Sequence, residues 1–222
     1  MSLHVILLTH LGLCDANIVL CTLQVVLIMT YRVFISFATG DDDYGRYLSE
    51  SLSRLEHIEV YVPDWIEVKG KNMDYKVKEG LDSARVVIVV ITFNSTNTVW
   101  LNQQIGYAFA KKIPIILVVE KGIDLKGFLE GSDFITYSRG DFKHNIFQVI
   151  SKLRKVFPGY LLEPAIENFY VICPICSKKF LESLPAQDLI SQKIEDRLTL
   201  SYTCQFCSIQ IKVEPSTLSA ST

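Results

Sequence analysis

The sequence lacks the signals that would place it in several common functional classes. Its formal net charge is only −2, so no overall positive charge draws it to nucleic acid or to an anionic membrane. No Gly-x-Gly-x-x-Gly and no Gly-Lys-Ser/Thr motif occurs in the chain, which excludes an ordinary Rossmann dinucleotide site and a P-loop. The acidic triplet at residues 41–43 is more typical of a solvated helix start than of a metal site.

Lysine and arginine are absent from the first 30 residues. The apolar run 18–29 is shorter than the ~20 residues that a membrane helix needs. A secretory signal would have a basic start and a small-residue cleavage site, and this segment has neither. We therefore interpret residues 1–30 as an apolar N-terminal extension and expect translation to begin at Met29. An added helix on the core and a weak membrane anchor are the alternatives.

Cysteine is concentrated near the C-terminus. Two Cys-x-x-Cys pairs occur there, formed by Cys173 with Cys176 and by Cys204 with Cys207. A chain that reserves its thiols in this way is typical of a metal-binding protein in a reducing compartment. We therefore expect a cytoplasmic location.

Residues 31–157 alternate between strand and helix patterns. Strand patterns cover residues 31–37, 58–62, 85–91, 113–119 and 134–137. Helical spacing of apolar residues covers 43–55, 72–83, the segment that starts near Trp100, and 142–157. The continuous apolar run 85–91 is typical of a strand covered on both faces of a parallel sheet. The pattern predicts a flavodoxin-like, doubly wound α/β fold with a five-stranded parallel sheet.

Ligands of such sheets bind beyond the carboxyl ends of the strands, near the point where the strand order reverses. In this chain that edge would comprise residues 37–41, residues 92–98 and the loop around Trp65. We call this edge the rim. It is the expected ligand site.

Several motifs between residues 31 and 156 resemble Toll/interleukin-1 receptor (TIR) domains. Residues 33–37, Val-Phe-Ile-Ser-Phe, precede a polar loop and an acidic helix start, as in the first box of that family. Residues 87–108, which include Trp100, resemble the third strand and following helix of bacterial and archaeal members. Residues 113–115 and 126–128 continue the match.

The resemblance implies an activity. Many prokaryotic TIR proteins are NAD glycohydrolases or ADP-ribose cyclases of antiphage defence, with a Glu four residues after the Trp. Here Gln104 stands four residues after Trp100. NAD⁺ is thus the implied substrate or ligand, and TIR–TIR self-association is implied as well.

Gln104 departs from the chemistry that the family uses. Breaking the N-glycosidic bond develops positive charge on the ribose, which a carboxylate stabilises or captures. A glutamine can hydrogen-bond a ribose hydroxyl but offers no charge, and losing one such group commonly costs on the order of 10²–10³ in rate. Three explanations remain: an engineered Glu→Gln form, a natural binding protein, or an enzyme that uses another acid, with Glu67 and Glu79 as candidates.

The resemblance and the rim together predict the nucleotide contacts. They are Phe37, Ala38, Thr39, Asp41, Trp65, Thr92, Asn94, Ser95 and Trp100. Trp100 would stack on nicotinamide or simply pack its helix against the sheet. Asn94 and Ser95 would contact ribose or phosphate, or cap the next helix. Trp65 lies in a segment that resembles the BB loop, which TIR domains use for assembly and for closing over nucleotide.

The C-terminal cysteines predict a zinc ribbon at residues 169–214, after a linker at 158–168 and before a disordered tail at 215–222. Four thiolates suit a structural tetrahedral Zn²⁺ and leave no open position for catalysis. A redox dithiol is the weaker alternative, because one dithiol needs only one pair. The balanced charge of the ribbon disfavours nucleic acid and favours contact with an effector or sensor protein.

The sequence thus predicts a TIR-domain defence protein that binds NAD or an ADP-ribose derivative, with Gln104 at the catalytic position. The alternative is a non-catalytic TIR scaffold that assembles through TIR–TIR contacts and recruits partners.

Overall fold

The computed structural model describes residues 4–5, 27–28, 30–63, 73–96, 98–140, 145–157, 168–183, 199–215 and 218–221. Its centre is a five-stranded parallel sheet in the order β4-β3-β5-β6-β7. The strands are β3 (Tyr31–Ser36), β4 (Ile58–Tyr61), β5 (Val86–Ile91), β6 (Ile115–Glu120) and β7 (Phe134–Tyr137). The helices are α1 (Asp42–Leu52), α2 (Met73–Ser83), α3 (Val99–Ala110) and α4 (Ile146–Val156), with a 3-10 turn η1 (Gly127–Leu129). The predicted doubly wound fold is confirmed.

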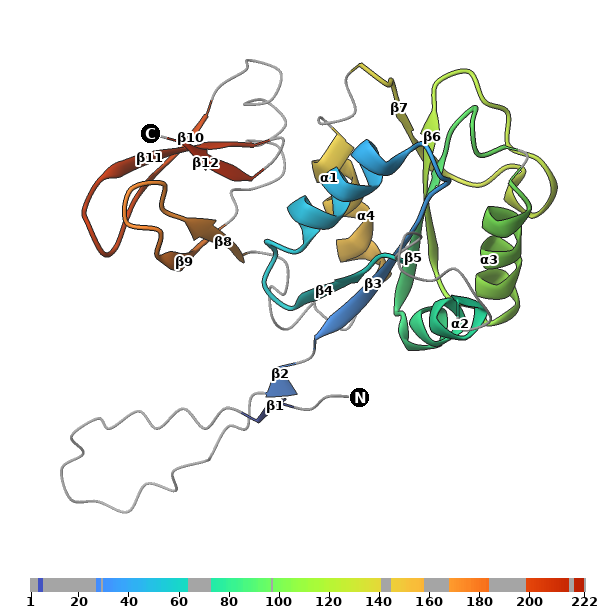
Figure 1. The fold of residues 1–222 in the computed structure, drawn as a ribbon, viewed down its shortest axis with the longest axis horizontal. Coiled ribbons are helices and arrows are strands. Elements are labelled where there is room, and N and C mark those ends of the chain that lie inside the picture. Colours follow the sequence, from blue (N-terminus) through green and yellow to red (C-terminus); the bar gives the residue numbers. More distant parts are fainter. Residues whose placement is uncertain are drawn as a thin grey trace.

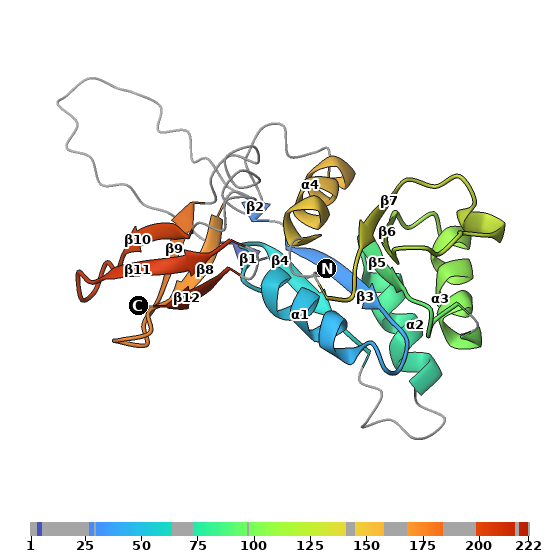
Figure 2. The same cartoon turned by 90° about the horizontal axis from the view of Figure 1, so that it is seen from above.

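Helices cover both faces of this sheet (Figures 1 and 2). Because side chains alternate along a strand, Ile35 and Ile88 join α1 and α4 in one core. Phe34 and Val87 join α2 and α3 in the other. All six residues of β5 are buried, which explains the uninterrupted apolar run in the sequence.

The chain runs from β3 outward to β4 and then crosses back to β5 on the other side of β3. The strand order therefore reverses between β3 and β5. The carboxyl ends of these two strands, at Ser36 and Ile91, flank the place where such sheets bind ligands.

The C-terminal module consists of short antiparallel strands. They are β8 (Asn168–Ile172), β9 (Lys179–Ser183), β10 (Leu200–Thr203), β11 (Gln210–Glu214) and β12 (Ser219–Ser221). β8 pairs with β9, while β10, β11 and β12 form a three-stranded sheet. The prediction of a disordered tail at 215–222 is wrong at residues 218–221, because β12 pairs with β11 and Leu218 is fully buried. The Ser/Thr-rich composition of this segment suggested disorder, and Leu218 is the only large apolar residue in it that indicates packing.

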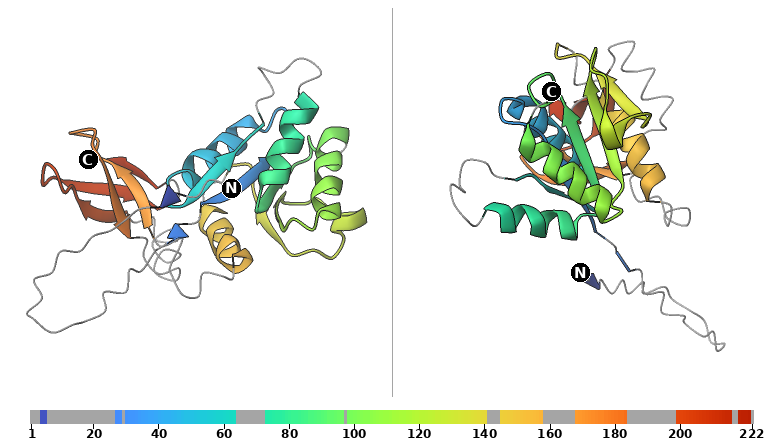
Figure 3. Two further views of the ribbon diagram at one scale, coloured as in Figure 1. Left: turned by 90° about the horizontal axis from the view of Figure 1, so that it is seen from below. Right: turned by 90° about the vertical axis from the view of Figure 1, so that its right-hand side faces the viewer.

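The C-terminal module is hydrogen-bonded to the turn between α1 and β4. The Tyr170 amide donates to the Arg54 carbonyl at 2.7 Å, and the Glu56 amide donates to the Asn168 carbonyl at 3.1 Å. Leu55 and Phe169, both at most 1 % exposed, form the bridge between these contacts. Figure 3 shows the module beside α1 and β4, away from α2 and α3. Residue 168, expected in the linker, belongs to β8, and residues 158–167 lie outside the described part.

Near the N-terminus, β1 (His4–Val5) pairs with β2 (Leu27–Ile28) in antiparallel fashion. Residues 6–26 lie outside the described residues. Within the described part of the chain, no helix combines the length and the apolar character needed to cross a membrane. The interpretation of residues 1–30 as an extension stays a prediction.

Two helical glycines provide a matched test of the packing. A Cβ on Gly45 in α1 would overlap the ring of Phe37, whereas a Cβ on Gly106 in α3 would meet nothing within 4 Å. We expect Gly45→Ala to lower the free energy of unfolding by about 1–3 kcal/mol through overpacking. Gly106→Ala should raise it by up to about 1 kcal/mol through helix propensity. Urea unfolding measures both, and equal effects of the two substitutions would contradict the packing of Phe37 under α1.

Candidate functional site

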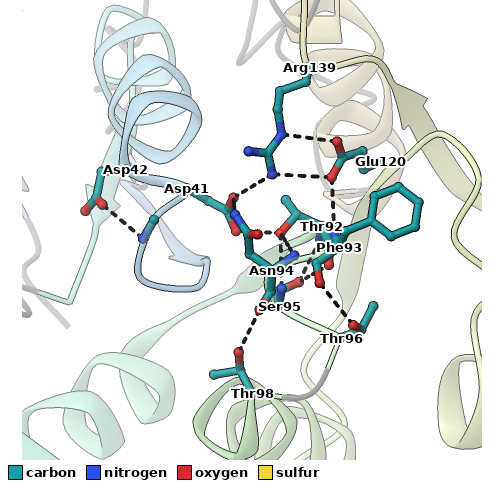
Figure 4. Close-up of polar contacts among 11 residues, drawn as sticks. Asp41, Asp42, Thr92, Phe93, Asn94, Ser95, Thr96, Thr98, Glu120 and Arg139 are labelled. Atoms are coloured by element: carbon teal, nitrogen blue, oxygen red, sulfur yellow. Dashed lines mark hydrogen bonds and ion pairs between the residues drawn. The ribbon is translucent and has the colours of Figure 1, made fainter.

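Asp41 occupies the centre of the rim. It precedes α1 and is only 6 % exposed. Its carboxylate accepts a hydrogen bond from the Thr92 hydroxyl at 2.6 Å and one from the Asn94 amide at 3.4 Å, and it pairs with Arg139 at 3.3 Å (Figure 4). A buried carboxylate with this many donors is satisfied without a ligand. Asp41 therefore ties the start of α1 to the end of β5.

Arg139 extends this network to the neighbouring strands. Its Nε lies 3.1 Å from the Glu120 carboxylate, which also accepts the Phe93 amide at 3.1 Å (Figure 4). The hydrogen bond to Glu120 raises the pKa of Arg139 above its usual value. Arg139 and Glu120 were not among the residues predicted for the rim. The signal was present, because Glu120 ends β6 and Arg139 follows β7 by two residues, and the carboxyl ends of parallel strands share one edge.

The loop after β5 is held by its own side chains. The Ser95 hydroxyl accepts from the Thr92 amide at 2.6 Å and donates to the Thr92 carbonyl at 3.0 Å. The Thr92 hydroxyl accepts from the amides of Asn94 and Ser95. Thr92 and Ser95 are at most 1 % exposed, and their hydroxyls are already engaged with groups of the protein. Of the predicted contacts in this loop, only Asn94 is exposed.

The other predicted nucleotide contacts divide between core and surface. Phe37 and Ala38 are at most 4 % exposed, and Phe37 packs under α1. Thr39 is exposed and Trp100 is half-buried against the α2–α3 core. Trp65 lies outside the described residues. The structure thus brings Asp41, Thr92, Asn94 and Ser95 together, with Thr39 at the same edge.

Gln104 lies on the inner face of α3 and is 3 % exposed. The hydroxyl of Ser36, the last residue of β3, donates to its Oε1 at 2.5 Å. Within the described residues its Nε2 has no hydrogen-bond partner. A buried donor without a partner commonly costs about 1–3 kcal/mol, so this position holds an unused hydrogen-bonding group. Of the alternative acids, Glu79 faces solvent on α2 and Glu67 lies outside the described residues.

A cavity of about 620 Å³ adjoins the same loop. It is lined by Phe93, Ser95 and Thr96 of the loop, by Leu101, Asn102 and Ile105 of α3, and by residues 122–127. Of the predicted nucleotide contacts, Ser95 lines it. Ser36, Trp100 and Gln104 do not line it.

The four C-terminal cysteines converge on one point. Their sulfur atoms all lie within 4.8 Å of one another, and Cys173 to Cys207 and Cys176 to Cys204 are each 3.7 Å apart. A tetrahedral ion with bonds of about 2.3 Å to sulfur requires sulfur atoms about 3.8 Å apart. The arrangement of the cluster is therefore compatible with a bound metal ion.

The two Cys-x-x-Cys segments have the same backbone conformation. In each, the serine after the second cysteine has a positive φ, 56° at Ser177 and 58° at Ser208. Each serine amide donates to the carbonyl of the first cysteine at 2.9 Å. The Cys176 amide donates to the Cys173 sulfur and lowers the pKa of that thiol to about 6. Thiolates are the form that binds metal, so this hydrogen bond favours the ligand state of Cys173. Burial and the neighbouring thiols raise the pKa of Cys207.

Comparisons with known proteins give one family. The family model described as TIR domain matches residues 33–150. Among solved structures, the TIR domain of the Toll-related receptor TRR-2 from the lower metazoan Hydra magnipapillata is similar, with 16 % identity and a TM-score of 0.47, covering 57 % of this chain and 98 % of that one. A conserved protein from Enterococcus faecalis has 19 % identity and a TM-score of 0.36, covering 44 % and 69 %. No curated protein sequence matches the chain.

Two threonines of the loop after β5 test the rim network. Thr92→Val removes the hydroxyl that donates to the buried Asp41, so we expect the free energy of unfolding to fall by about 1–3 kcal/mol. Thr96 is exposed and its hydroxyl donates to the Phe93 carbonyl, so Thr96→Val should change the free energy of unfolding by less than about 0.5 kcal/mol. Chemical denaturation compares the two. A Thr92→Val variant as stable as the parent would contradict the role of Asp41.

Proposed function

We propose, from the premise that this chain belongs to the TIR domain family, that it is a signalling or defence protein whose rim binds NAD or an ADP-ribose derivative. Its lineage would be that of the NAD glycohydrolases and ADP-ribose cyclases of prokaryotic antiphage defence, which the motifs around Trp100 resemble. With Gln104 where that lineage has Glu, the chain binds the nucleotide and cleaves it poorly.

The buried Ser36–Gln104 pair carries this proposal. It adjoins the carboxyl end of β3, where the strand order reverses, and its Nε2 is an unused donor in the described part of the chain. A carboxamide can donate to a ribose hydroxyl or to a ligand carbonyl. It cannot stabilise the positive charge that develops on the ribose as nicotinamide leaves. The geometry therefore supports binding more than turnover.

Restoring the carboxylate tests the catalytic position. We expect Gln104→Glu to raise the rate of NAD cleavage by on the order of 10²–10³, measured as nicotinamide release by chromatography. Gln103→Glu is the matched control, because Gln103 is the exposed neighbour on the same helix and should leave the rate unchanged.

The unmodified chain should bind NAD in an isothermal titration while it releases little nicotinamide. If Gln104→Glu stays as inactive as the parent at saturating NAD, with the protein folded and assembled, the enzyme lineage is refuted. Equal activation by Gln103→Glu would also refute the assigned position.

A non-catalytic scaffold is the second candidate, and one observation favours it. Asp41, Thr92 and Ser95, expected to bind nucleotide, are hydrogen-bonded to other groups of the rim. Because these polar groups already have hydrogen-bond partners within the protein, the rim needs no ligand to satisfy them. The domain would then act through TIR–TIR contacts. Self-association in light scattering without any heat of NAD binding would favour this candidate over the first.

For the C-terminal module we propose a structural zinc ribbon in a protein of the cytoplasm. The donor set supports this, since four thiolates prefer Zn²⁺ and a reducing compartment keeps them reduced. Cys173, Cys176, Cys204 and Cys207 would hold the ion, which would supply folding free energy that so small a module lacks. An effector or sensor protein is the proposed partner of this module.

Metal content tests the ribbon. Purified protein should contain one zinc per chain by elemental analysis, and chelation should lower the melting temperature by on the order of 10 °C. Cys204→Ser should lower both the zinc content and the melting temperature, whereas Cys14→Ser, which leaves the four clustered cysteines intact, should lower neither. Protein that holds no zinc after growth in zinc-supplemented medium, or a melting temperature indifferent to chelator, would contradict the proposal.

A further inference from the structure

The end of the sheet opposite the rim carries an apolar groove with a basic edge. It lies between the C-terminal ends of α3 and α4 and has a volume of about 860 Å³. Its floor includes Ile113, Ile115 and Leu129, to which α4 adds Val156. These residues stand near the amino end of β6, so the groove is distinct from the Ser36–Gln104 pair. We call it the lysine-rimmed groove.

Two stacked phenylalanines form one wall of this groove. The rings of Phe109 and Phe128 have their centroids 5.0 Å apart and their planes inclined by 19°. Phe109 is 52 % exposed and Phe128 is 70 % exposed. Exposed aromatic side chains beside an apolar cavity are typical of surfaces that bind another molecule, because they bury a large area on contact.

The charge around the groove is mainly positive. Lys112, Lys152 and Lys155 line it, and Asp133 is the only acidic residue among its lining residues. Asp133 is already paired with Lys152. Among the described residues, neither Lys112 nor Lys155 forms an ion pair, although the charge of Lys155 contributes to lowering the pKa of Asp133. The edge therefore presents two cations to whatever occupies the apolar floor.

Lys112 lies at a position where glycine would make the fold more stable than lysine does. It follows α3 with φ 57°, and its amide bonds to the Phe109 carbonyl while the Ile113 amide bonds to the Ala108 carbonyl. This is the Schellman arrangement, in which glycine is preferred because a side chain costs roughly 1 kcal/mol there. The helix dipole favours a cation at this end, but Lys111 already supplies one. Neither the backbone conformation nor the helix dipole therefore explains the lysine at position 112.

From these observations we propose that the lysine-rimmed groove binds an acidic amphipathic segment of a partner protein. Large apolar side chains of the segment would fill the floor and contact Phe109 and Phe128. Carboxylates on its flanks would face Lys112 and Lys155. Such an interface uses apolar anchors for affinity and edge charges for rate and specificity. The proposal does not depend on NAD binding, since the groove lies at the other end of the sheet.

A pair of defined peptides tests the charge preference on the full chain. The probe is a fluorescently labelled helical peptide of about 18 residues with Leu at i, i+3, i+4 and i+7 and Glu elsewhere; the control peptide has Lys in place of Glu. Fluorescence anisotropy should give a dissociation constant at least about tenfold lower for the acidic peptide. Raising the salt concentration should weaken its binding. Equal binding of both peptides, or none by either, would overturn the proposal.

Variants locate the binding. Lys112→Glu with Lys155→Glu should reverse the preference between the peptides, whereas Lys121→Glu with Lys126→Glu, outside the groove, should not. Phe128→Ser should raise the dissociation constant of the acidic peptide by about tenfold or more. Tyr75→Ser on α2, where the side chain is about equally exposed, should leave that constant unchanged. A control pair that acts as strongly as the groove pair would overturn the assignment.

Lys112→Gly separates binding from folding. Because glycine suits the positive φ, the variant should melt at a higher temperature than the parent, yet bind the acidic peptide several-fold more weakly. If affinity is unchanged while stability rises, Lys112 takes no part in binding and the proposal fails at that residue.

Discussion

The buried carboxylate of Asp41 is the constraint on which the rest of the rim depends. A charge that is 6 % exposed must be matched by donors, and here they come from Thr92 and Asn94 after β5 and from Arg139 after β7. Through Arg139 and Glu120 the same network reaches the end of β6 (Figure 4). One carboxylate thus fixes the start of α1 against three strand ends.

This arrangement determines which groups remain for a ligand. The polar atoms most engaged with one another, at Asp41, Thr92 and Ser95, form the support of the rim. The Nε2 of Gln104, buried beside Ser36, has no partner in the described part of the chain. In the proposed nucleotide site this group would supply a neutral donor, which cannot stabilise the positive charge that cleavage develops.

The elements of the fold could be read from the sequence because each has a local cause. β5 is a continuous apolar run, α4 has one apolar stripe, and the two Cys-x-x-Cys pairs predict by their spacing that the four cysteines come together. The rim network could not be predicted in detail, since Asp41 and Arg139 are 98 residues apart and meet only through the topology. β12 was missed because its anchor is the single residue Leu218. The lysine-rimmed groove was missed because several separate elements contribute to it.

The side-chain amide of Gln104 provides the most direct test of the central claim. In ¹⁵N-edited NMR spectra the Nε2 protons of Gln104, assigned through a Gln104→Glu variant, can be followed as NAD is added. The account predicts that these resonances shift to saturation while those of the exposed Gln103 do not. Resonances of Gln104 that remain unchanged at saturating NAD would show that its amide does not contact the nucleotide, and the central claim would be wrong.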